Sequence, residues 1–169
     1  KPHDNGDSGW VSAVAKQGFE LLKQAIKDSI QTEKDAMDFY RLAGEKMYNE
    51  RPRLTFKLLA HEEREHARSF YEAYSRDGLP PFDILMAAPP DADSIWLKEL
   101  KEAMLGDFDE KQALALAMQL EQALEEELRA IAERIEAVAV REVYLSNARM
   151  THGHLEMLTE DYNLAHLQD

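Results

Sequence analysis

The chain has 169 residues, of which 44% are hydrophobic and 31% charged, and this length and composition suit one globular domain rich in helix. Its net charge of −13 argues against a nucleic-acid partner and against an anionic membrane surface, since both need clustered Lys and Arg. The chain has no cysteine, which excludes disulfides, thiolate metal sites and thiol catalysis.

The first half of the chain predicts a tail and two long helices. Residues 1–10 are mostly polar and contain glycine, so they are predicted to form a flexible tail. Helix-compatible spacing of apolar residues, starting with Phe19, predicts a first helix over about 11–49. Pro52 suits the first turn of a second helix, which is predicted to end by Gly78.

The second half predicts one short helix and two more long ones. Residues 79–93 are predicted to be irregular. Ser94 can cap a short helix that runs to about Met104, and Asp109 can cap the third long helix. A break near residues 137–140 leads to the fourth long helix.

Short links between long helices 1 and 2, and between 3 and 4, predict two helical hairpins. The connection over residues 78–108 is long enough to cross the length of a bundle. The predicted fold is therefore all-α, a ferritin-like four-helix bundle over residues 11–169. Its two helical hairpins are joined by one long crossover between helices 2 and 3.

Each long helix carries a polar or ionisable residue in the middle of its apolar face. These residues are Glu33 on the first helix, Glu63 and His66 on the second, Glu121 on the third, and Thr151 and His154 on the fourth. A buried carboxylate without a partner is costly, so three carboxylates and two imidazoles at one level indicate a bound cation. Carboxylate and imidazole together suit iron, manganese or zinc.

The spacing of these residues indicates a duplicated hairpin. The two matching pairs, each 88 residues apart, are Glu33 with Glu121 and His66 with His154. Such a repeat predicts a site with pseudo-two-fold symmetry that is suited to two metals. At the same offset, Glu63 aligns with Thr151, so the repeat lacks one carboxylate.

Four sequence segments together resemble the rubrerythrin branch of the ferritin-like superfamily. They are TEKDAMDFY, EREH, QLEQALEEE and HGHLEML, one on each predicted helix, and the resemblance covers roughly residues 19–162. It implies that Glu33 and Glu121 are terminal ligands on opposite metals and that Glu63 bridges them. His66 and His154 would supply the nitrogen ligands.

The resemblance also implies a cofactor, substrates and partners. The cofactor would be two irons, with manganese or zinc as other metals, and the substrate peroxide or oxygen. Family members take electrons through a rubredoxin-like domain whose iron is held by four cysteines, so any electron donor here is a separate protein. The expected assembly is a homodimer.

The threonine at position 151 leaves the chemistry open, because the family pattern has a second bridging carboxylate there. Glu125 or His152 could replace the missing ligand, and Tyr40, two turns from Glu33 on the same face, could hydrogen-bond the site. Three outcomes remain: two metals with a solvent bridge, one metal centred on Glu63 and His66, or a lost site.

Two classes of function follow from these outcomes. The first is a non-haem di-iron oxidoreductase that acts on peroxide or oxygen. The second is a metal-binding or degenerate ferritin-like protein without catalytic turnover. The chain shows no signal-peptide pattern and no apolar run of membrane-spanning length, so the expected location is cytoplasmic.

Overall fold

A computed structural model describes the backbone of residues 6–74 and 78–168, and the side chains from residue 16 onward. The described residues form six helices and no strand, so the all-α prediction is confirmed. The helices are α1 (Gly6–Gly44), α2 (Glu50–Ala73), α3 (Phe82–Ala87), α4 (Ile95–Ala103), α5 (Glu110–Glu133) and α6 (Val138–His166). None of them is both long and apolar enough to cross a membrane.

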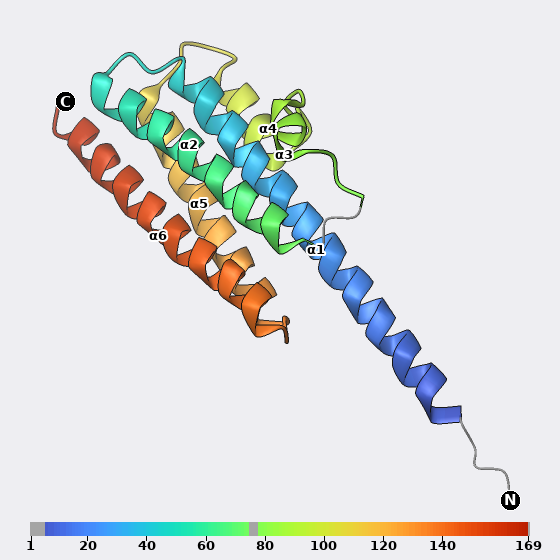
Figure 1. Cartoon of the computed structure of the whole chain (residues 1–169). Helices are drawn as coiled ribbons and strands as arrows, with labels where there is room; N and C mark the ends of the chain where they lie inside the picture. The colour runs from blue at the N-terminus through green and yellow to red at the C-terminus, as the bar shows by residue number, and fades with distance from the viewer. Residues whose placement is uncertain (1–5, 75–77, 169) are drawn as a thin grey trace, which may run out of the picture.

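The four long helices pack as two pairs, α1 with α2 and α5 with α6, and α2 also lies against α6 (Figure 1). Short links join the members of each pair, as the sequence predicts for two hairpins. The link between the pairs carries α3, which contacts α2, and α4, which contacts α1 and α5. Side chains from both pairs therefore face a shared interior.

The core is dominated by aliphatic and aromatic side chains at the predicted helical spacing. An aromatic cluster joins α1 to its neighbours: the Tyr40 ring meets Phe56 of α2 edge-on at 5.0 Å, and Phe39 meets Trp96 of α4 at 5.4 Å. All four of these side chains are at most 3% exposed. Their packing fixes α2 and α4 against the C-terminal part of α1.

Two predicted helix starts are confirmed by side-chain caps. The Ser94 side chain accepts a hydrogen bond from the Leu97 amide at the start of α4. Asp109 accepts from the amides of Lys111 and Gln112 at the start of α5. These bonds satisfy amides that have no partner within the helix.

Several predicted boundaries are wrong. Helix α1 begins at Gly6, so it includes half of the predicted tail, and residues 1–5 lie outside the described part. It ends at Gly44 rather than near residue 49. The N-terminal part of α1 runs past the other helices (Figure 1), which is why Phe19 is 49% exposed instead of buried.

The crossover contains more structure than predicted. Residues 82–87 of the segment predicted to be irregular form the short helix α3, which begins after Pro81. The Phe82 ring packs edge-on against Tyr71 of α2 at 5.5 Å, and the Arg68 guanidinium lies 4.3 Å from its centre. This contact, rather than helix propensity, holds so short a helix in place.

Candidate metal centre

The four long helices bring the predicted ligands to one place in the core. Helix α2 supplies two of them, three residues apart and so on one face, and each other long helix supplies one. The five side chains are Glu33 (α1), Glu63 and His66 (α2), Glu121 (α5) and His154 (α6), and each is at most 3% exposed. Buried apolar side chains lie on the same helix faces, so these five groups are shielded from bulk solvent.

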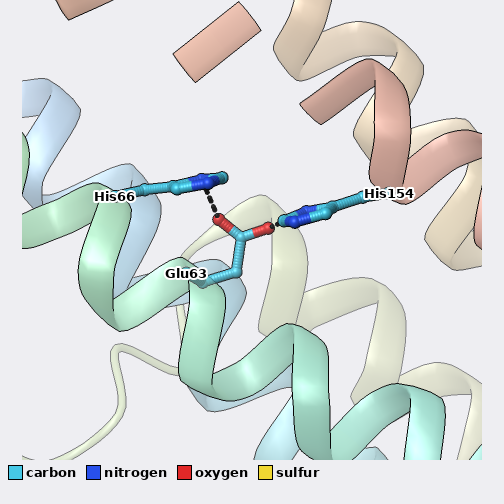
Figure 2. Close-up of side chains that lie close together, drawn as sticks. All are labelled: Glu63, His66 and His154. Atoms are coloured by element: carbon cyan, nitrogen blue, oxygen red, sulfur yellow. Dashed lines mark hydrogen bonds and ion pairs between the residues drawn. The ribbon is translucent and has the colours of Figure 1, made fainter. Parts of the chain in front are cut away.

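Glu63 lies between the two imidazole rings (Figure 2). Its Oε2 atom is 3.1 Å from Nδ1 of His66, and its Oε1 atom is 3.0 Å from Nδ1 of His154. The rings themselves are nearly parallel, with centres 5.1 Å apart. Each carboxylate oxygen thus faces a different histidine, which is the arrangement that a carboxylate bridging two cations needs.

The other two carboxylates flank this central group, each beside the histidine of its own hairpin. Glu33 Oε2 is 3.6 Å from Nδ1 of His66, and Glu121 Oε1 is 3.5 Å from Nδ1 of His154. Both distances are ion-pair distances that are too long for good hydrogen bonds. The geometry therefore has the pseudo-two-fold symmetry that the 88-residue repeat predicts.

Several buried polar atoms in and near this group have no hydrogen-bond partner among the described residues. They are both carboxylate oxygens of Glu33, Oε2 of Glu121, Oδ1 of Asn147 and the hydroxyl of Thr151. Buried carboxylate oxygens without a donor are costly and uncommon in folded proteins. The oxygens of the two glutamates are hard ligands that lie beside imidazole nitrogens, so the donor set fits a divalent transition metal.

When no metal is bound, protons on the ligand side chains balance the buried negative charges. Burial and the neighbouring Glu63 carboxylate raise the pKa of Glu33 to about 8. Burial alone would lower the pKa of both histidines, but the surrounding carboxylates raise it to about 10 for His66 and about 11 for His154. Burial and Glu121 would raise the pKa of Glu63, but hydrogen bonds and nearby positive charge leave it below its ordinary value.

Tyr40 contacts the site as the sequence predicts. Its buried hydroxyl donates a 2.6 Å hydrogen bond to Oε1 of Glu121, which links α1 to α5. Burial, and then the charge of Glu121, raises the pKa of Tyr40 well above its ordinary value, so the phenol keeps its proton. This bond leaves the other oxygen of Glu121 free to bind a cation.

Glu125 and His152, which could have replaced the missing ligand, lie apart from the buried group. Glu125 binds Arg129 at 3.0 Å and Nδ1 of His152 at 2.9 Å, and the histidine side chain is 52% exposed. The spacing of four between Glu125 and Arg129 is a signal in the sequence for this surface pair. Thr151 does lie in the core, at 0% exposed, so a neutral hydroxyl stands at the position that the repeat aligns with Glu63.

One residue at the site was not predicted. Oε2 of Glu62 is 2.6 Å from Nε2 of His154, on the side of the ring away from Glu63. A carboxylate in this position orients the ring and keeps a proton on Nε2, which leaves Nδ1 as the atom that faces the site. Glu62 is adjacent to Glu63 in the sequence, but it lies about 100° around the helix from the ligand face.

Comparison of the chain with protein-family models, with curated proteins and with solved structures gave no significant match.

Proposed function

We propose that this chain is a ferritin-like, rubrerythrin-type bundle that binds two metal ions, with iron as the main candidate and manganese or zinc as others. The bridging position of Glu63 between His66 and His154 is the observation that carries this proposal. Glu33 and Glu121 would each complete one end of the site. The oxygens that lack donors on these two residues fit the cations better than they fit an empty core.

With two ferrous ions bound, the site would supply electrons for the reduction of peroxide or oxygen, and the chain would act as a non-haem di-iron oxidoreductase. The protein's part is to hold and shield the site. Glu62 fixes the ring of His154, and Tyr40 fixes Glu121. Because all five ligands are buried, only small molecules would reach the metals. We expect a separate electron-donor protein and a homodimer.

The neutral Thr151 favours a second candidate function. Two divalent cations bring four positive charges, while the buried glutamates Glu33, Glu63 and Glu121 supply three negative ones. A site with this deficit can bind metal less tightly at the His154 end, next to the threonine. The alternative is therefore a metal-binding bundle that holds one ion, or none, and has no catalytic turnover.

Metal content after anaerobic loading with ferrous iron separates these functions. The oxidoreductase proposal expects about two irons per chain, followed by their rapid oxidation when peroxide is added. About one iron per chain without rapid oxidation supports the alternative. No bound iron overturns the oxidoreductase proposal and leaves only the metal-free form of the alternative. His154→Ala is expected to lose metal, whereas His152→Ala is a matched control, because that histidine is exposed and two residues away.

A further inference from the structure

A narrow cleft between α1 and α5 leads from the surface towards the candidate metal centre. Its wall is formed by Ser29, Thr32 and Glu33 of α1 and by Leu124, Glu127, Leu128 and Ile131 of α5. Glu127 is exposed, while Glu33 is 0% exposed. The cleft is narrow: the centre of a water molecule can occupy about 10 Å³ of it, which is room for about one water.

The cleft holds two hydroxyls and two acids, and one of the acids, Glu33, lies 3.6 Å from Nδ1 of His66. Neither oxygen of Glu33 has a hydrogen-bond partner, and Glu127 has no hydrogen bond or ion pair within the described part of the chain. Glu127 therefore offers an exposed carboxylate in the same cleft as the buried Glu33. A cation in the cleft would give the oxygens of both residues a partner.

Neighbouring acids on α5 differ from Glu127 in this respect. Glu125 is paired with Arg129 and His152, and Glu126 accepts a hydrogen bond from Gln122. Three larger pockets of the described structure contain none of the five candidate ligands in their walls. The cleft at Glu127 thus combines a surface carboxylate with a residue of the metal centre.

We propose that this cleft is the path by which a divalent cation enters the metal centre, with Glu127 as its first ligand and Glu33 as its last. The proposal rests on the proposed function, since it needs a metal centre at the inner end. A hydrated cation is wider than the cleft, so it can enter only if protein oxygens replace its waters one after another. Glu127, the Thr32 hydroxyl and Glu33 offer such oxygens in order of increasing depth.

The experiment is the rate of cobalt(II) uptake by the apoprotein, followed in a stopped-flow instrument by the absorbance of the bound ion. Glu127→Gln is expected to slow uptake about tenfold at low ionic strength, the lower end of electrostatic steering effects. Glu127→Lys is expected to slow it further. The amount of cobalt bound at equilibrium is expected to stay at the parent value, because Glu127 is not one of the five ligands.

Glu126→Gln is the matched control, because it removes the same charge from the next residue of the same exposed segment. Equal uptake rates in Glu127→Gln and Glu126→Gln would overturn the entry path and leave the metal centre intact. A lower final cobalt content in Glu127→Gln would also overturn it, because Glu127 would then be a permanent ligand. A parent protein that binds no cobalt would instead contradict the proposed function itself.

Discussion

Metal binding at the candidate centre should release protons, because protons occupy the ligand atoms in its absence. The pKa values of about 8 for Glu33, about 10 for His66 and about 11 for His154 leave all three groups protonated at pH 7. A carboxylate or an imidazole Nδ1 must lose its proton before it can bind a metal. Loading two ions therefore displaces three protons, one from each of these residues.

The magnitude follows from the number of protons. Each displaced proton makes the apparent binding constant change about tenfold per pH unit. Because protons compete with the metal, affinity rises with pH. The overall constant for loading both ions should rise about 10³-fold per pH unit below pH about 8, and about 10²-fold above it, where Glu33 is already deprotonated.

Calorimetric titration with zinc measures this proton release. Zinc has no redox chemistry, and titration in two buffers with different heats of ionisation gives the number of protons that the buffer takes up. The parent protein is expected to release about three protons at pH 7, and Glu33→Gln about two. Release of less than about one proton, or an affinity that is flat between about pH 6 and 8, would refute the assigned ligands.

Three further variants test individual side chains. Thr151→Glu adds a carboxylate beside the other buried ligands, so it should lower the melting temperature of the apoprotein and tighten metal binding; Met150→Glu, at a more exposed neighbour, should do neither. Tyr40→Phe removes the hydrogen bond that the phenol donates to Oε1 of Glu121, and it should cost about 1–3 kcal/mol of unfolding free energy in a denaturant titration of the apoprotein. Glu62→Ala should weaken zinc binding about 10–100-fold through loss of its bond to His154, whereas the exposed Glu65→Ala should leave binding unchanged.

The sequence was sufficient for those parts of the fold that depend on local pattern. Apolar periodicity predicted the long helices, and Ser94 and Asp109 predicted two of their starts. The start of α1 was missed because the glycines of residues 6–9 are poor helix formers, so their composition is that of a tail. Helix α3 was missed because six residues between prolines carry too little periodicity, and its stability depends on tertiary contacts of Phe82.

The sequence predicted those residues of the candidate site that recur in both hairpins. A common offset of 88 residues identified the glutamate and histidine of each hairpin before any contact was known, and the structure places all of them around Glu63. Glu62 could not be found in this way, because it is off the ligand face of α2 and reaches His154 only across the contact with α6. Glu127 could not be singled out in the sequence, because it is one of three consecutive glutamates and only the fold shows which of them lines the cleft.

The two histidines have unequal surroundings, because Glu62 lies beside His154 while the equivalent position of the repeat is Met150. At the His66 end the nearby carboxylates are Glu33 and Glu63; at the His154 end they are Glu121, Glu63 and Glu62, the last of which is partly exposed. Glu62 therefore returns a negative charge to the half of the site in which Thr151 replaces a carboxylate. It does so through the far side of the ring, where it strengthens the imidazole as a ligand without occupying a coordination position. If metal is bound at this end, the neutral hydroxyl of Thr151 would leave it one carboxylate short of what the repeat predicts, and a solvent or substrate oxygen could take that place.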